Sequence, residues 1–481
     1  MGRAVAVWGA VVVACAAAEA APRPIKNEGA LARAERRAAR KLVKAYLKLI
    51  KELEKQGEDH YARVEALKAL RLDPEHKKLR ARVEEEADPP IKTPPGYREA
   101  ARELRRRAGA ALGRILDQAI EGGLSRDVLE PSALRVLAFD PDHPGARRVL
   151  GFQGGPGKWR TARQQALALA YAKAWKEGPA PKPLEEIPWK NLEKALGIEL
   201  LAVQGQHCFA ACDRKNPHPK QLETIARAGD LAFAAFAHDL LGAETFFWSP
   251  EPRPQLTGVP AAKYSKPLFL LLENRSMHVR FLETCVSDEQ LKVSGRGLGF
   301  VNTAYLPDQV IVSEGWQPGR FLREWPSQRM VFQLVAQVFG PRRPYYLVMG
   351  LARHYSGFIS GEARIRLVPR GSRTERDRTA RKVSDFFGLR RLCREAYAEA
   401  RALPPLAKGI FRTLESMRRS DEALACAFVE YLLAERRGDL LALLRDGDAK
   451  QRGPHELVPH VFGDDAPRVD KAFLDWLLRN Y

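Results

Sequence analysis

The chain has 481 residues, of which 45% are hydrophobic, and a formal net charge of +20. This length predicts two or three domains, and the apolar content is enough for packed cores. The basic balance is compatible with anionic partners. The densest basic stretch, residues 364–382, has no interleaved aromatic residues for base stacking, so nucleic acid is not the expected partner.

The N-terminus predicts an export signal. Met1–Arg3 supplies a short positive start, Ala4–Ala14 is apolar, and Ala18–Ala20 offers a small-x-small cleavage site. We therefore expect residues 1–21 to be a signal peptide and the protein to be secreted or periplasmic. Val12–Cys15 also resembles a lipobox, which would place a lipid anchor on Cys15 and tether the protein to the envelope; an uncleaved anchor is the third alternative.

The N-terminal half has a helical pattern and contains a repeat. Ala, Leu, Lys, Arg and Glu at helical spacing predict a first helix over residues 30–57. The segment Glu65–His76, which ends in Leu-Asp-Pro-Glu-His, recurs 67 residues later as Ser132–His143, which ends in Phe-Asp-Pro-Asp-His. Arg80 and Arg147 align as well.

This repeat resembles the second helix of tetratricopeptide units, whose period is ~34 residues, about half of the observed offset. Residues 22–150 are accordingly expected to form a divergent tetratricopeptide-like segment, and the resemblance implies protein–protein contact. A plain helical bundle with two chance Asp-Pro stops is the alternative. The proline-rich linker at residues 87–96 should not be helical.

A connecting region is expected over residues 151–196. It contains a predicted short hairpin at residues 151–161, a helix at about 162–176 and the proline-rich run Gly178–Pro183. Its Gly157-Lys158 pair is not a phosphate-binding loop, because the required glycine spacing is missing.

The C-terminal half alternates apolar runs with helical patterns. Hydrophobic periodicity predicts strands, helices and a hairpin in the order strand, helix, strand, helix, hairpin, helix, helix. The expected segments are 200–203, 219–241, 268–272, 277–286, 299–305 with 309–313, 320–339 and 344–358, followed by late helices at 425–433 and 473–477.

The last two helices of that order carry the most informative pattern. Met330–Phe339 is followed by Pro344–Ser356, which contains Gly350-Leu351-Ala352. The pair resembles the active-site helices of peptidase-MA-like, or gluzincin, proteins. In that family the first helix carries His-Glu-x-x-His and the second a Glu before Gly-Leu-Ala, which together bind zinc.

The residues at those positions in this chain cannot do that chemistry. In the best register Phe332 replaces the first His, Gln333 the general base, Ala336 the second His and Met349 the ligand Glu. A register shifted by one residue places Gln333 and Gln337 at the His positions. We therefore expect a vestigial site with no metal, cofactor or catalytic residue. Ordinary core helices without such an ancestry are the alternative.

The resemblance covers residues 197–481 and implies a zincin-like domain. The expected fold class is α+β and predominantly helical: a helical-repeat-like segment followed by a domain with a small mixed sheet and C-terminal helices. In the resembled peptidases an edge strand binds extended substrate, which makes Phe300, Asn302 and Ala304 the expected edge of a peptide groove.

No other ligand set is apparent. His455 and His460 are five residues apart with Pro459 between them, and His207, Cys208 and Cys212 lack a second pair of ligands. Pairing among Cys208, Cys212, Cys285, Cys393 and Cys426 stays open. The sequence thus favours a secreted, non-catalytic pseudopeptidase that binds protein or peptide; a structural envelope protein or an enzyme of unrecognised chemistry is the alternative.

Overall fold

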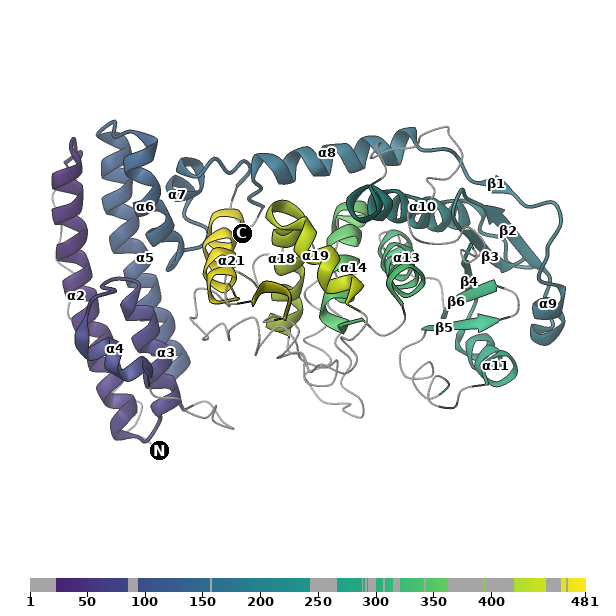
Figure 1. Ribbon diagram of the computed structural model, residues 1–481, viewed down its shortest axis with the longest axis horizontal. Helices are drawn as coiled ribbons and strands as arrows, with labels where there is room; N and C mark the ends of the chain where they lie inside the picture. Colours follow the sequence, from purple (N-terminus) through teal and green to yellow (C-terminus); the bar gives the residue numbers. More distant parts are fainter. Residues whose placement is uncertain are drawn as a thin grey trace. The chain divides into compact units, whose positions relative to one another are not determined.

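A computed structural model describes most of the chain (Figure 1). The described residues are 23–84, 94–155, 158–242, 266–287, 300–305, 308–314, 321–340, 343–361, 419–446, 460–463 and 466–481, with 289, 292 and 393 as single positions. The predicted signal peptide with Cys15, most of the 87–96 linker, the basic stretch at 364–382 and His455 lie outside them. The fold is predominantly helical with a small mixed sheet, as the sequence predicted.

The chain divides into two compact units. The first contains residues 1–165 together with 390–404 and 471–481, and the second contains 166–389 and 405–470. The sequence pattern had placed residues 471–481 with the second half, whereas the structure groups them with the first unit.

The first unit is built from helices. They are α2 (Glu28–Lys55), α3 (Asp59–Leu70), α4 (Lys77–Glu84), α5 (Tyr97–Glu121), α6 (Arg126–Leu137) and α7 (Pro144–Val149). Asn27 caps α2 by accepting the Ala30 N–H at 2.8 Å. The helix ends just before Gly57, whose φ of 72° is the left-handed conformation that the sequence-predicted stop requires.

The two copies of the repeated segment adopt the same turn. Arg80 Nε donates to the carbonyl of Pro74 at 2.7 Å, and Arg147 Nε donates to the carbonyl of Pro141 at 2.8 Å. The arginine thus satisfies the carbonyl that the Asp-Pro turn exposes. Since Arg80 and Arg147 occupy equivalent positions, the repeat noticed in the sequence is also a repeat of local structure.

Small residues on α5 make room for the second copy of this turn. A Cβ on Gly109 would lie 2.8 Å from Cβ of Asp140, and one on Gly113 would lie 2.5 Å from Nε2 of His143. Glycine at both positions lets α5 approach the turn closely.

A buried polar group ties α3 to α5 within the apolar core of this unit. The Glu65 carboxylate, which is fully buried, accepts hydrogen bonds from Lys68 Nζ at 2.6 Å and from the Tyr97 hydroxyl at 2.7 Å. Around it the core is formed mainly by Leu and Ala, with Tyr46 and Tyr97 as its largest aromatic side chains.

A short hairpin and a long helix follow α7 in the chain. Gln153 and Arg160 exchange backbone hydrogen bonds of 2.8 and 3.0 Å, which confirms the predicted short hairpin. Helix α8 (Ala162–Glu177) follows where the sequence predicted a helix and crosses the boundary between the units.

The second unit contains one mixed sheet. Its strands are β1 (Lys182–Pro183), β2 (Leu200–Gln204), β3 (Phe209–Asp213), β4 (Leu268–Leu272), β5 (Phe300–Tyr305) and β6 (Asp308–Glu314). The order is β1-β2-β3-β4-β6-β5; β3, β4 and β6 run parallel to one another, while the remaining pairs are antiparallel. The predicted strands at 200–203 and 268–272 and the predicted hairpin are all present.

One strand corrects the predicted element order. The expected first strand is one arm of a hairpin, because β3 follows β2 directly and pairs with it. The sequence pattern missed β3 since its five residues are centred on Ala210 and Ala211, which carry little strand signal.

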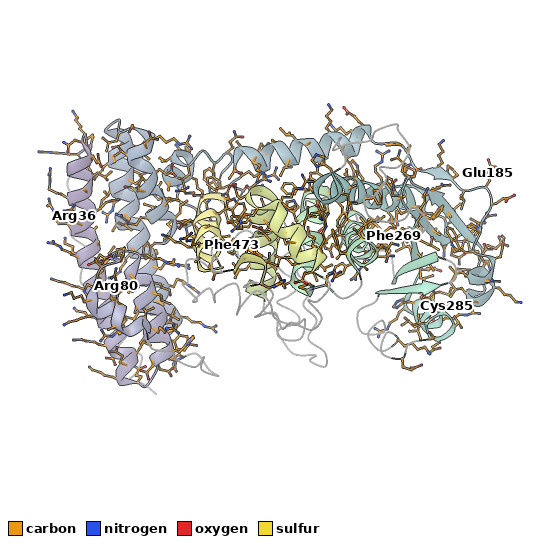
Figure 2. The ribbon with its side chains drawn as sticks, viewed as in Figure 1. Arg36, Arg80, Glu185, Phe269, Cys285 and Phe473 are labelled. Atoms are coloured by element: carbon orange, nitrogen blue, oxygen red, sulfur yellow. The ribbon has the colours of Figure 1, made fainter. Side chains whose placement is uncertain are left out.

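Helices cover both faces of the sheet. The helices of the second unit are α9 (Lys190–Leu196), α10 (Pro219–Leu241), α11 (Arg275–Cys285), α13 (Phe321–Phe339), α14 (Tyr345–Ser360), α18 (Arg419–Glu435) and α19 (Arg437–Arg445). Helix α21 (Ala466–Asn480) begins in the second unit, but its residues from 471 onward belong to the first. Along β4, Leu268, Leu270 and Leu272 pack with α9 and α11. Phe269, which points the other way, meets Trp325 of α13 at 5.5 Å between ring centroids (Figure 2).

Candidate functional site

Helices α13 and α14 pack against each other and carry all the positions of the expected vestigial site. Gln333 and Met349 are buried, whereas Phe332, Ala336 and Gln337 are half-buried. The Arg329 guanidinium lies 5.3 Å from the centroid of the Phe332 ring, a cation–π distance.

These side chains do not fit a zinc ion. Zinc in proteins is held by imidazole, thiolate or carboxylate groups, and neither Phe332 with Ala336 nor Gln333 with Gln337 supplies one. In the described part of the chain no three His, Cys, Asp or Glu side chains are grouped so that they could hold a metal. The five expected positions therefore supply no zinc ligand.

A buried ion pair occupies the interface of the two helices instead. Arg353 Nη1 on α14 lies 3.1 Å from Glu324 Oε1 on α13, and both side chains are less than 5% exposed. Gln328 Nε2 donates to the same carboxylate oxygen at 2.9 Å and to the Ser356 hydroxyl at 3.3 Å. The Glu324 carboxylate therefore joins α13 to α14 through its ion pair with Arg353.

Gly350, the centre of the pattern that suggested a peptidase, has a packing role. A Cβ at this position would lie 2.6 Å from the carbonyl oxygen of Ala425 and 2.7 Å from Val429 Cγ2, both on α18. Glycine lets α14 and α18 cross closely. This requirement explains Gly350 without reference to any catalytic ancestry.

The aromatic end of the same pattern is anchored from α10. Tyr355 is fully buried, with its ring 6.5 Å from that of Phe236 on α10. Burial, followed by the nearby Asp239 charge, raises the pKa of this phenol well above its usual value. His238 Nδ1 lies 2.8 Å from Asp239 Oδ1. His354, which occupies the position before Tyr355, is buried, with its ring 5.2 Å from those of Tyr355 and Phe358.

The expected peptide-groove residues lie on the last strand of the sheet. In β5 Phe300 pairs with Ser313, Asn302 with Ile311 and Ala304 with Gln309 of β6. Among the strands that the structure describes, none pairs with the other side of β5. Backbone donors and acceptors along that side are the kind of edge to which an extended peptide can add.

A buried carboxylate that the sequence did not single out, Asp230, meets the Cys208 thiol at the β2–β3 turn. Asp230 of α10 accepts the N–H groups of Gln206 and His207 at 2.8 and 2.7 Å. Cys208 Sγ lies 3.6 Å from Asp230 Oδ1, and a Cβ on Gly205 would collide with the carboxylate. The sequence signals that could have revealed the turn are Gly205, directly after a predicted strand, and Asp230, a carboxylate within an otherwise apolar helical segment.

This cluster does not form a nucleophilic site. Burial, followed by the neighbouring Asp230 charge, raises the pKa of the Cys208 thiol well above its usual value, so the thiol stays protonated and unreactive. Cys212 on β3 is also buried and is not bonded to Cys208. The Asp230 carboxylate acts as a clamp on the turn.

Comparisons with known proteins do not assign the chain to a family. No protein-family model matches it, and no curated protein matches it. Among the described helices none is both long and apolar enough to cross a membrane.

Proposed function

We propose that the protein is an exported, non-catalytic relative of gluzincin peptidases that binds an extended protein segment along the open side of β5. The observation that carries the proposal is the combination of a helix pair unable to bind zinc with a six-residue strand at the end of the sheet. In this proposal α13 and α14 belong to the hydrophobic core, and the binding surface is the backbone on the open side of β5.

The interior of the helix pair supports a structural role for the former catalytic frame. Glu324 is neutralised by Arg353, Gly350 is fixed by the crossing with α18, and Tyr355 is fully buried against Phe236 of α10. None of these groups is left to polarise a peptide bond or activate water. A peptide bound along β5 would stay intact.

Metal content and peptidase activity test the non-catalytic half of the proposal. The purified protein should contain less than one-tenth equivalent of zinc and should cleave no unfolded protein substrate in a chelator-sensitive manner. Stoichiometric zinc with chelator-sensitive cleavage would instead establish an enzyme.

Hydrogen exchange tests the binding half, with carboxymethylated, permanently unfolded α-lactalbumin as the probe. Its addition should slow exchange at amides of residues 300–305 and leave those of β4 unchanged. Since neighbouring residues of an antiparallel strand direct their N–H groups to opposite sides, Asn302→Pro and Thr303→Pro form a matched pair. The proline that replaces the residue whose N–H group points to the open side of β5 should abolish binding while the protein stays folded.

Retained binding in both folded proline variants would exclude β5 as the binding edge. If the unfolded α-lactalbumin does not bind the wild-type protein and does not slow exchange at β5, a structural envelope role becomes the better account.

A further inference from the structure

The outward face of α2 is exclusively basic. Every exposed residue between Leu31 and Lys55 is a lysine or an arginine. We call this set the α2 basic face: it consists of Arg33, Arg36, Arg37, Arg40, Lys41, Lys44, Lys48, Lys51 and Lys55. Figure 2 shows Arg36 on the side of α2 that is directed away from the other helices of its unit.

The nine side chains form a straight stripe. At about 100° and about 1.5 Å per residue, they fall within an arc of about 140° and extend over roughly 33 Å of helix. The opposite side of α2 is fixed in the core of the first unit by buried Leu42, Tyr46 and Ile50. The helix therefore cannot roll to offer its apolar side to a partner.

Carboxylates within the unit neutralise little of this charge. Glu35 is bonded to Arg135 at 2.6 Å, and Glu54 is bonded to Arg82 of α4, with the second oxygen 3.2 Å from Nη2. Of the α2 basic face, Lys55 alone has a carboxylate within salt-bridge distance among the described residues, namely Glu52 at 3.7 Å. The remaining eight cations face solvent as an uncompensated line of charge.

We propose that the α2 basic face docks the protein on the anionic surface of a phospholipid bilayer. A straight line of cations on a rigid helix can bring all nine charges to a plane at once. The phosphates of a nucleic-acid duplex wind away from such a line, so only part of it could engage them. The α2 basic face is a surface separate from β5, and its docking on a bilayer does not depend on peptide binding at β5.

The position of α2 in the chain supports this partner. If Cys15 carries a lipid, residues 16–27 can span at most about 43 Å when extended, so α2 would be held close to the bilayer. A basic surface close to the bilayer is attracted to anionic lipid headgroups. Docking through the α2 basic face itself needs no lipid on the protein.

Vesicle sedimentation tests the proposal with the mature chain from Pro22, which carries no acyl group. It should partition onto vesicles of phosphatidylglycerol and phosphatidylcholine but not onto phosphatidylcholine alone. Raising the salt from about 0.05 M to about 0.5 M should weaken partition at least tenfold, because exposed charges are screened.

Two variants with equal loss of charge locate the contact. The quadruple variant Arg36→Gln, Arg40→Gln, Lys44→Gln and Lys48→Gln should lose at least tenfold in partition. The matched variant Lys173→Gln, Lys176→Gln, Lys194→Gln and Lys220→Gln, all exposed positions of the second unit, should lose less than twofold. Circular dichroism and the melting temperature verify that both variants are folded.

Three results would overturn the proposal: no partition onto anionic vesicles at low salt, equal losses in the two variants, or displacement of bound protein by a 30-base-pair DNA duplex at a lower concentration than by free anionic vesicles. The last result would identify the α2 basic face as a nucleic-acid surface.

Discussion

Asp230 shows how a single buried residue determines the shape of a hairpin. Its carboxylate holds the β2–β3 turn through two backbone N–H groups and is only 2% exposed. Burial is the largest effect on its ionisation and outweighs these hydrogen bonds, raising the pKa of Asp230 to about 6. In the unfolded chain the same group ionises near its ordinary pKa of 3.8.

The raised pKa of Asp230 predicts a pH-dependent stability. Between the two pKa values the folded protein holds a proton that the unfolded chain has released. The free energy of unfolding should therefore fall as pH rises from about 4 to about 7, by on the order of 3 kcal/mol from this group. The Asp230→Asn side chain does not ionise. The free energy of unfolding of this variant, measured by denaturant titration, should therefore lack the part of the pH dependence that comes from Asp230. Parallel pH profiles for wild type and variant would contradict the assignment.

Single residues also mark what could be read from the sequence. The absence of zinc ligands at positions 332, 333, 336, 337 and 349 follows directly from residue identities and needed no structure. The partner of Glu324 could not be predicted, since Arg353 lies on another helix, 29 residues away in sequence. The basic face of α2 could be predicted from the helical spacing of its lysine and arginine residues, although the stretch at 364–382 is denser in positive charge.

At the scale of elements, periodic patterns predicted the helices and the buried strands well. Helix α10 and strand β4 begin and end at the predicted residues, because one has a long apolar stripe and the other a continuous apolar run. Strand β3 and helix α9 were missed. Both are short, and their conformation depends on packing against the sheet and its covering helices.

The interface of α13 and α14 yields a prediction about element packing. Arg353→Met leaves the buried Glu324 carboxylate without its cation and should lower the free energy of unfolding by about 3–5 kcal/mol in a denaturant titration. The double variant Arg353→Met, Glu324→Leu should recover most of that loss, because no buried charge remains.

A surface ion pair provides the control for this prediction. Lys173 and Glu177 are 3.9 Å apart, with side chains 70% and 62% exposed. Lys173→Met should change stability by less than about 0.5 kcal/mol. If Arg353→Met is equally mild, the Arg353–Glu324 pair does not fasten the helices.

At the scale of the whole molecule, the end of the chain completes the first unit. Arg147 is almost fully buried and donates from Nη2 to the carbonyl of Tyr481 at 2.7 Å, while its guanidinium lies 4.2 Å from the Phe152 ring centroid. Gln164 Nε2 donates to the carbonyl of Asn480 at 3.1 Å. The sequence could not predict that residues 471–481 pack with the first unit, because a helical pattern does not specify which core a helix distant in sequence joins.

These contacts predict that the last helix, α21, stabilises α5, α6 and α7. Leu478 packs on the core of the first unit, so Leu478→Ala should cost about 1–3 kcal/mol. The loss should appear as faster hydrogen exchange at amides of residues 97–149, with exchange in α10 unchanged. Asp475→Ala, at an exposed position of the same helix, should alter neither. Faster exchange confined to α10 and α13 would mean that residues 471–481 stabilise the second unit, and the division of the chain would have to be redrawn.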